Sequence, residues 1–218
     1  MNLKTEKFYW QKGHRVVIGL DEAGRGPLAG PVFAAAVVIN PKINKKNQNF
    51  LDILKITRDS KRLSIIKREK IVKLLKNCPE IMFSYASVNE KIIDKINIEQ
   101  ATFLAMRKSI EKLKKKHRLL PDILLIDGNR RMTVSKHYPQ YQQRTIVKGD
   151  DKIFSIALAS IIAKVKRDKK MIALSKKYPQ YKFDIHKGYP TKLHRHLIKK
   201  YGPAKIHRKS YQPIKQYG

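Results

Sequence analysis

A short apolar segment that ends in two acids constrains the fold of this chain more than any other feature. Residues 16–20 read V-V-I-G-L, which predicts a buried β-strand, and Asp21 and Glu22 follow it at once. A loop rich in glycine and proline comes next over residues 23–31, and then a stretch of small and β-branched residues over 32–39. We therefore expect two neighbouring strands of one sheet, joined by a glycine loop.

The rest of the chain alternates strand and helix patterns. Strand patterns cover residues 81–88, 122–126 and 145–147, and helical patterns cover residues 64–76, 97–118, 154–174 and 191–200. Ser64 is the expected N-cap of the first of these helices, and residues 40–50 are expected to form a polar loop. The order predicts an α/β fold with a central mixed β-sheet flanked by helices. We expect one main domain over residues 1–184, with a small helical segment of residues 185–218 packed on it.

The distribution of charge indicates a polyanionic partner. Lys and Arg number 49 against 17 Asp and Glu, which gives a formal net charge of +32. A lysine bias of the whole genome could raise this charge without any function, but it would not explain why the acids stop at Asp184. Residues 185–218 carry only basic charges, and they interleave these with Tyr189, Tyr201, Tyr211 and Tyr217. Such a stretch suits the phosphates and bases of a nucleic acid.

The sequence gives no sign of a membrane span or a disulfide framework. No apolar run reaches the roughly 18–20 residues that a membrane-spanning helix needs, and the N-terminus lacks the apolar core of a signal peptide. The single cysteine, Cys78, excludes a disulfide or a cysteine-based zinc site within one chain. We therefore expect a cytoplasmic protein.

Four acids follow predicted strands or precede a predicted helix, namely Asp21, Glu22, Asp127 and Asp150. Sites of α/β sheets form beyond the carboxyl ends of strands, so these acids could meet at one place. Carboxylates that meet repel one another, and Mg²⁺ or Mn²⁺, which prefer oxygen ligands, would relieve the repulsion. Two such ions could clamp the attacking and leaving oxygens of a phosphodiester displacement. Taken singly, each acid could instead be a turn or capping residue, and Asp151 competes with Asp150.

The glycine loop, G-R-G-P-L-A-G over residues 24–30, does not fit the common nucleotide-binding loops. It lacks the lysine and hydroxyl ending of a P-loop, and the strand expected after it argues against a dinucleotide site. Gly24 and Gly26 would let backbone amides approach a nucleic-acid strand closely, and Arg25 could reach a phosphate. A plain tight turn is the alternative interpretation.

These residues resemble a known family. V-I-G-L-D-E-A-G-R-G-P-L-A-G-P-V over residues 17–32 is similar to the N-terminal signature of ribonuclease HII. Further segments resemble motifs of the same family in the same order: residues 59–64, 125–129, 148–150 with 160–168, 186–191 and 207–211. Ordered matches across roughly residues 15–214 make the resemblance highly specific.

The resemblance implies an RNase H-like fold and a metal-dependent endonuclease. It implies that the four acids hold Mg²⁺ or Mn²⁺, with two ions present when substrate is bound, and that they are catalytic. The substrate would be an RNA–DNA hybrid or a single ribonucleotide in duplex DNA, cut on the 5′ side of the ribonucleotide to leave 3′-hydroxyl and 5′-phosphate ends. The backbone of Gly24, Arg25 and Gly26 would sense the ribose 2′-hydroxyl together with Tyr189. Lys61 and Ser160 would contact phosphate.

Other functions stay open at this point. A non-catalytic nucleic-acid-binding protein would explain the charge but not the acids, and another RNase H-like metal nuclease would share the acids but cut all-DNA substrates. The C-terminal histidines lack the spacing of a zinc motif. Phosphate contacts or surface positions are expected for His186, His194, His196 and His207. We expect a monomer whose partner is nucleic acid.

Overall fold

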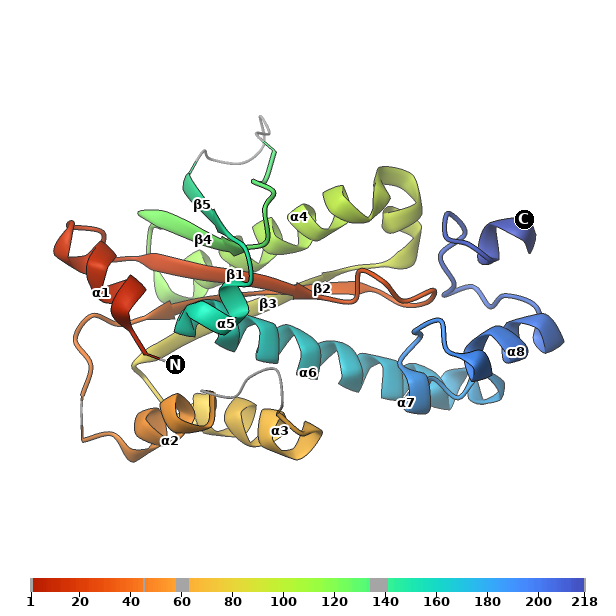
Figure 1. Cartoon of the computed structure of the whole chain (residues 1–218), viewed down its shortest axis with the longest axis horizontal. Coiled ribbons are helices and arrows are strands. Elements are labelled where there is room, and N and C mark those ends of the chain that lie inside the picture. The colour runs from red at the N-terminus through yellow and green to blue at the C-terminus, as the bar shows by residue number, and fades with distance from the viewer. Residues whose placement is uncertain (1, 45, 58–62, 134–140, 218) are drawn as a thin grey trace.

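The computed structural model of the chain describes residues 2–44, 46–57, 63–133 and 141–217. Its centre is a mixed sheet in the strand order β3-β2-β1-β4-β5 (Figure 1). β1 (Val17–Ala23), β2 (Val32–Ile39) and β3 (Ile81–Val88) are antiparallel neighbours, while β4 (Ile123–Asp127) and β5 (Gln142–Ile146) run parallel to β1. The predicted α/β fold with a central mixed sheet is confirmed.

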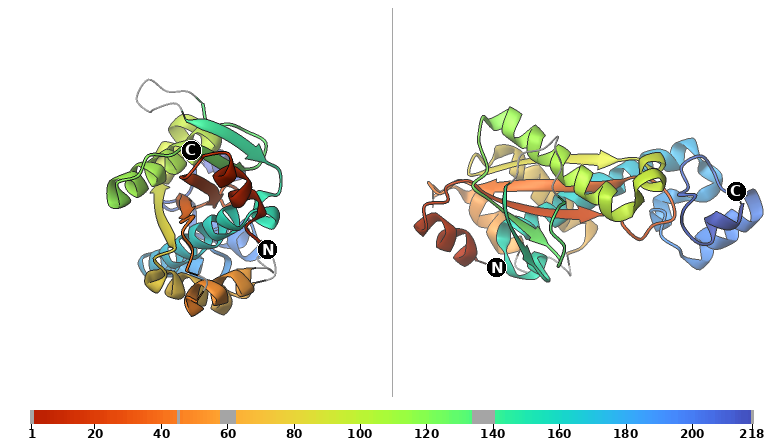
Figure 2. Two further views of the ribbon diagram at one scale, coloured as in Figure 1. Left: turned by 90° about the vertical axis from the view of Figure 1, so that its left-hand side faces the viewer. Right: turned by 90° about the horizontal axis from the view of Figure 1, so that it is seen from above.

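Long helices cover both faces of the sheet, which explains the continuous apolar sequence of β2. α4 (Glu90–His117) packs on one face and α6 (Phe154–Lys177) on the other (Figure 1, Figure 2). Phe33 and Val37 of β2 enter the core cluster on the α6 side, and Ala34 enters the cluster on the α4 side. A strand that is buried on both faces shows no polar alternation.

Shorter elements surround this core. α2 (Gln48–Thr57) and α3 (Ile65–Leu74) pack against α6 on the side away from the sheet (Figure 1). α1 (Lys4–Gln11) lies at one end of the molecule and α8 (Lys192–Tyr201) at the other (Figure 1, Figure 2). The remaining short helices are η2 (Leu75–Asn77), α5 (Gly149–Lys152), η3 (Pro179–Tyr181), α7 (Phe183–His186) and η4 (Ile214–Tyr217). Within the described ranges, no helix is both long enough and apolar enough to cross a membrane.

The structure corrects the bounds of several predicted elements. α2 begins at Gln48, inside the expected polar loop, because Phe50 and Ile53 reach the core on the α6 side. β5 begins at Gln142, earlier than expected, because pairing with β4 defines this strand and its side chains are not an apolar series. The expected N-cap of α3 is confirmed, since Ser64 Oγ accepts the backbone N–H of Lys67 at 3.3 Å.

The helix expected from residue 97 begins earlier, at Glu90. Asn89 caps it by accepting the backbone N–H of Ile92 at 3.1 Å. At Asn97 the backbone leaves the helical region with a φ of 64°, and the side chain of Asn97 caps the following turns through the N–H of Gln100 at 3.0 Å. The predicted amphipathic helix is thus the second of two helical pieces that meet at a kink.

The C-terminal region wraps around the glycine loop. A third core cluster joins the two and contains Leu28, Ala29, Met171, Tyr181, Phe183, Leu197, Ile198, Ile206 and Ile214. The N–H of Leu28 donates to the carbonyl of Gly188 at 2.8 Å, and the N–H of Arg208 donates to the carbonyl of Leu28 at 2.8 Å. Residue 184, the expected boundary of the main domain, lies inside α7. The C-terminal residues and the glycine loop therefore pack as one unit at the end of the sheet.

Candidate active site

The carboxyl ends of three parallel strands meet at one end of the sheet. β1, β4 and β5 run parallel, and Asp127 is the last residue of β4. Beyond β5 the chain turns at Lys148, whose φ of 56° is left-handed, and α5 begins. The N–H of Gly149 donates to Asp127 Oδ1 at 2.6 Å. This bond fixes the first turn of α5, and with it Asp150, beside the end of β4.

Asp21 and Glu22 lie inside β1, and the expectation that the strand ends before them was wrong. β1 pairs with β2 as far as Ala23, but its pairing with β4 stops at Leu20. At this end of the sheet β2 extends further than β4 does. Pairing with β2 therefore keeps β1 extended through Asp21 and Glu22. The first residue of β4 beyond the paired positions is Asp127. Asp127 therefore follows the last paired residue of β4, just as Asp21 follows the last residue of β1 that pairs with β4.

The protein neutralises these acids only in part. Asp21 is 5% exposed, and burial raises its pKa well above the ordinary value, with the charges of Glu22 and Asp127 adding to the effect. Hydrogen bonds from Ser160 and from the backbone N–H of Glu22 act in the opposite direction. Burial also raises the pKa of Glu22, although Arg25 Nη1 lies 3.5 Å from Glu22 Oε1 and lowers it. Acidic groups thus gather at this end of the sheet, where a bound cation would relieve their repulsion.

A cleft of about 310 Å³ opens beside the acids. It is lined by Glu22, Ala23, Gly24, Arg68, Asp150, Ser160, Ile161, Lys164 and Tyr189. The cleft brings together residues that the sequence had singled out from β1, the glycine loop, α5, α6 and the C-terminal region. Segments that are far apart in the chain thus form one site.

The other predicted site residues take different positions. Asp21 and Asp127 interact electrostatically with each other but are not part of the cleft lining formed by the described residues. Gly26 is exposed in the loop beyond the cleft, and Asp151 is exposed while its neighbour Asp150 lines the cleft. Lys61 lies outside the described residues.

Two basic residues of the cleft, Arg68 and Lys164, were missed from the sequence. Lys164 follows Ser160 by four residues on a predicted helix, and this spacing places both on one face, so a signal was present. Lys164 Nζ pairs with Asp168 at 2.9 Å. Arg68 lies on α3, whose approach to α6 depends on the whole fold, so no local pattern could identify it.

The donor set suits divalent cations, although the carboxylates are not gathered at coordinating positions. Within the described ranges, no group of three or more His, Cys, Asp or Glu side chains could hold a metal ion as it stands. Like charges in a buried site repel one another, so carboxylates separate until a cation draws them together. A set that offers only carboxylate oxygens matches Mg²⁺ and Mn²⁺. Burial, and after it the charges of Glu22 and Asp127, raise the pKa of Asp21 among these oxygens.

The glycine loop is held from behind by Arg208. Its guanidinium is fully buried and donates to the carbonyl of Gly24 at 2.6 Å and to that of Arg25 at 2.8 Å. In a trans peptide the C=O and the following N–H point in opposite directions. The N–H groups of Arg25 and Gly26 are therefore turned away from Arg208.

The two glycines of the loop have different reasons to be glycine. Gly24 has a φ of 103°, and a Cβ there would lie 2.1 Å from Arg167 Nε, so a side chain is excluded by the protein itself. Gly26 has no such restriction, because nothing lies within 4 Å of the position of its Cβ. Neither backbone strain nor packing among the described residues explains why Gly26 lacks a side chain.

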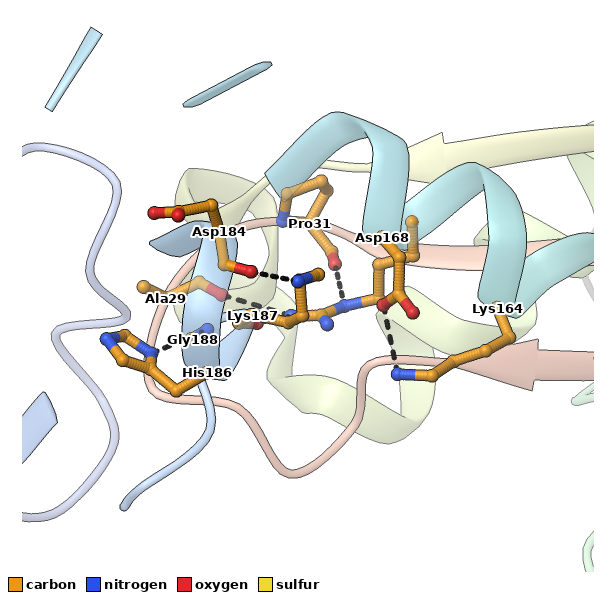
Figure 3. A network of polar contacts seen from close by, with 9 residues as sticks. Ala29, Pro31, Lys164, Asp168, Asp184, His186, Lys187 and Gly188 are labelled. Carbon is orange, nitrogen blue, oxygen red and sulfur yellow. Dashed lines mark hydrogen bonds and ion pairs between the residues drawn. The ribbon is translucent and has the colours of Figure 1, made fainter. Parts of the chain in front are cut away.

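Tyr189 forms the wall of the cleft that comes from the C-terminal region. It is 37% exposed, and its ring centroid lies 5.3 Å from Lys164 Nζ and 5.5 Å from the guanidinium carbon of Arg167. The same guanidinium is buried and donates to the carbonyls of Ala29, Pro31 and Lys187 at 3.0 to 3.3 Å (Figure 3). Arg167 thus ties the glycine loop to the backbone that precedes Tyr189.

The expectation that the C-terminal histidines lie at the surface or on phosphate was wrong for three of them. His186, His194 and His207 are buried, and His196 is exposed. The three buried rings contact Phe183 of the third core cluster. Burial follows from the way the segments around α7 and α8 fold back on each other, which no local pattern reveals.

Comparisons with known proteins place this chain in a family. The family model described as Ribonuclease HII matches residues 18–214. The chain is 49% identical over 219 residues to the ribonuclease HII of Caldicellulosiruptor bescii, with 97% of each sequence covered. The crystal structure of ribonuclease H2 from Pyrococcus horikoshii OT3 matches with a TM-score of 0.67 and 25% identity, covering 93% of this chain and 96% of that one. Bst-RNase HIII in complex with Mn²⁺ shares the fold, with a TM-score of 0.72, 16% identity and coverage of 93% and 68%. The predicted RNase H-like fold is confirmed.

Proposed function

Because the chain belongs to the ribonuclease HII family, we propose that the four acids at the carboxyl ends of β1, β4 and β5 hold its divalent cations. The protein is a metal-dependent endoribonuclease that acts on RNA–DNA hybrids and on ribonucleotides embedded in DNA. The observation that supports the site most strongly is the raised pKa of Asp21, caused by burial and by its two acidic neighbours. A chain of net charge +32 that concentrates negative charge at one buried point fits a cation site.

The cations would be Mg²⁺ or Mn²⁺, with two ions present when substrate is bound. Support comes from the oxygen-only donor set and from the Mn²⁺ held by Bst-RNase HIII. When bound, such ions neutralise the phosphate, lower the pKa of an attacking water and stabilise the leaving oxygen. The cut on the 5′ side of the ribonucleotide, with 3′-hydroxyl and 5′-phosphate products, belongs to the same proposal.

The chain's own cations would bind and orient the substrate phosphates. Arg68 and Lys164 line the cleft and supply positive charge opposite the acids, and Ser160 offers a hydroxyl at the same wall. Arg25 is paired with Glu22 at 3.5 Å, so a metal ion at Glu22 would release the guanidinium for a phosphate. Lys61, which the family resemblance assigns to phosphate, joins this group as a proposal.

Recognition of the ribose would come from two sides of the cleft. The outward N–H groups of Arg25 and Gly26 can donate to a 2′-hydroxyl, and Tyr189 can pack against the same sugar. Gly26 supports this assignment, because the space where its Cβ would lie is open and no packing within the described residues requires a glycine there. A substrate backbone that approaches closely would require it.

The C-terminal segment of residues 185–218 would add affinity for the nucleic-acid backbone. Apart from the buried Arg208, the lysines and arginines of this segment face no acid within it, and each phosphate that they neutralise releases counterions. We also propose that the protein acts as a monomer in the cytoplasm, a location that suits its single, buried cysteine, Cys78.

The experiment that tests the proposed function uses a labelled duplex with one ribonucleotide beside an all-DNA duplex of the same sequence. With Mg²⁺ or Mn²⁺ we expect one cut, 5′ of the ribonucleotide, and no cut in the all-DNA duplex. Asp127→Asn should lower the rate by about 10³-fold, as expected when several kcal/mol of metal-based stabilisation are lost. Asp52→Asn is the matched control, since Asp52 lies on α2 outside the cleft. Cleavage of all-DNA would favour another RNase H-like nuclease, and an unchanged Asp127→Asn rate would refute the site.

A further inference from the structure

Three buried histidines lie behind Tyr189 and come from separate segments. His186 ends α7, His194 lies in the first turn of α8, and His207 follows α8. The ring centroids of His186 and His194 are 4.2 Å apart and nearly parallel, and those of His194 and His207 are 5.3 Å apart. Their exposed fractions are 6%, 0% and 2%. We call these residues the histidine trio.

The hydrogen bonds of the trio determine which nitrogen of each ring carries the proton. The carbonyl of Tyr189 lies 3.0 Å from His194 Nδ1, and because a carbonyl can only accept, Nδ1 must be protonated. In a neutral ring Nε2 is then an acceptor, so His207 Nε2, which lies 3.1 Å away, must donate to it. His207 Nδ1 is consequently unprotonated, and it accepts the backbone N–H of Ala204 at 2.8 Å.

The opposite set of tautomers, with protons on His194 Nε2 and His207 Nδ1, fails at both Tyr189 and Ala204. It would set a lone pair of His194 Nδ1 against the carbonyl of Tyr189, and a proton of His207 Nδ1 against the N–H of Ala204. The carbonyl of Ala204 also lies 3.2 Å from His207 Nδ1, and it accepts the backbone N–H of His207 at 2.9 Å instead. The first set of tautomers therefore satisfies the three shorter contacts of the two rings, at 2.8 to 3.1 Å.

His186 holds the residue just before Tyr189. Its Nδ1 accepts the N–H of Gly188 at 3.1 Å (Figure 3), so its Nε2 carries the proton and donates to the carbonyl of Tyr181 at 2.7 Å. The backbone from residue 187 to residue 189 is thus held at each step: the carbonyl of Lys187 by Arg167, the N–H of Gly188 by His186, and the carbonyl of Tyr189 by His194.

We propose that the histidine trio is a relay of fixed tautomers that positions Tyr189, and that His194 is a positioning residue for discrimination between ribose and deoxyribose. The inference rests on the proposed role of Tyr189 in contacting the sugar. The relay fixes the backbone of Tyr189 while its ring stays partly exposed at the cleft, so the ring meets the substrate at a set depth. Geometry held by buried hydrogen bonds restricts such a contact more tightly than a loop on the surface could.

The surroundings of the trio support its neutral state. Burial is the largest cause that lowers the pKa of His194 to about 3 and of His207 to about 4. Asp184 and Lys187 are the charged groups beside His186, and they act on its pKa in opposite directions. Each ring nitrogen already takes part in a hydrogen bond, so an added proton would break one.

Substitutions at His194 separate its two hydrogen bonds. His194→Phe keeps a ring but removes both, whereas His194→Asn keeps an N–H donor at the position of Nδ1. For the single-ribonucleotide duplex we expect His194→Phe to lower kcat/KM by about tenfold, the equivalent of one buried hydrogen bond, and His194→Asn to recover most of this loss. His196→Phe, at the exposed histidine of the same helix, is the matched control and should stay within about twofold of the wild type. Equal losses for His194→Phe and His194→Asn would overturn the proposal.

A double-mutant cycle with Tyr189→Ala tests whether His194 acts through the tyrosine. We expect the effect of His194→Phe to disappear once the Tyr189 ring is absent, and effects that multiply would overturn the positioning role. If Tyr189→Ala alone leaves kcat/KM unchanged, the proposed sugar contact fails, which is a different result.

The tautomers of the histidine trio are tested by ¹⁵N NMR of the histidine rings at pH 7. We expect the Nδ1–H tautomer for His194 and the Nε2–H tautomer for His186 and His207, and an Nε2–H tautomer at His194 would refute it.

Discussion

The acid cleft at the carboxyl ends of β1, β4 and β5 and the cluster of histidines and arginines behind Tyr189 both bury polar groups, but they do so in opposite ways. At the carboxyl ends of these strands, Asp21 and Glu22 lie beside a third acid, Asp127, Arg25 pairs with Glu22, and burial raises the pKa values of Asp21 and Glu22. Behind Tyr189, the guanidinium of Arg208 donates to the carbonyls of the glycine loop. His194 and His207 there share a hydrogen bond, and all three histidines bond to backbone groups.

The difference indicates what each region is for. Buried groups that satisfy each other form a rigid support, because any displacement breaks hydrogen bonds that water cannot replace. Buried charges that remain uncompensated require a partner from outside, and they lower stability until it arrives. We therefore assign chemistry to the acid cleft and positioning to the cluster behind Tyr189. The predictions below test this contrast.

The largest effect is expected at Asp21. Asp21→Asn should lower activity by about 10³-fold, because a metal-binding charge is lost. The raised pKa means that the folded chain holds this proton more tightly than the unfolded chain, so ionisation costs stability as the pH rises through the folded pKa. In EDTA at pH 8, Asp21→Asn should therefore raise the melting temperature. Scanning calorimetry measures this, and a lowered melting temperature would mean that the acid is structural.

At Arg208 the opposite result is expected, a loss of stability. Arg208→Ala would remove the guanidinium donors of the Gly24 and Gly30 carbonyls and leave the Arg25 carbonyl with the hydroxyl of Tyr211, at a cost of about 3 kcal/mol in the free energy of unfolding. Urea unfolding measures this cost. Arg68→Ala is the matched control, because Arg68 lines the cleft and should affect substrate binding without a comparable loss of stability. Equal stability losses for the two arginines would remove the contrast.

Two glycines of the glycine loop show the same contrast. Packing requires a glycine at position 24 but not at position 26. Gly26→Ala should keep the melting temperature and lower kcat/KM on a single ribonucleotide by about tenfold, since a methyl group would occupy space that only substrate needs. Gly24→Ala should destabilise the protein, because its Cβ would collide with Arg167. Thermal melts and initial rates of both variants check this. A destabilised Gly26→Ala with normal kinetics would contradict it.

The smallest effect concerns pH. The pKa values of His194 and His207 fall from 6.5 to about 3 and about 4 on folding, so the unfolded chain binds more protons between pH 4 and 6.5. Stability should therefore decrease as the pH falls through this window. Unfolding at pH 7.5 and pH 5.5 measures the decrease, which should be smaller in His194→Phe. An equal decrease in both proteins would show that His194 is not a source of it.

The strands and four of the helices, α3, α4, α6 and α8, could be predicted because their signals are local. The apolar run of β2 and the acids that follow the apolar part of β1 are visible in the sequence, and so is the glycine loop. α1 and α2 were missed because their stability comes from distant contacts. Glu6 of α1, for example, accepts the N–H of Ser155 at the start of α6 at 2.8 Å. No window of neighbouring residues contains that information.

The residues of the proposed site were visible in the sequence, and those that hold them in place were not. The four acids and Tyr189 carry motifs, whereas Arg167 lies in the run K-V-K-R-D-K-K over residues 164–170, which is typical of a solvated basic face. Arg167 is fully buried because carbonyls from two remote segments surround it. The histidines likewise look like surface residues until α7 and α8 fold back on each other. A side chain that is buried by backbone carbonyls of distant segments cannot be recognised from its sequence neighbours.

The central claim, that the acids at the carboxyl ends of β1, β4 and β5 form the metal site, is tested most directly by a titration without nucleic acid. Calorimetry at pH 8 would measure Mn²⁺ binding to the wild type, to Asp127→Asn and to Asp52→Asn. The account predicts that the wild type and Asp52→Asn bind Mn²⁺ alike, and that Asp127→Asn loses at least about tenfold in affinity because one ligand charge is gone. Equal Mn²⁺ affinities in all three proteins would contradict it.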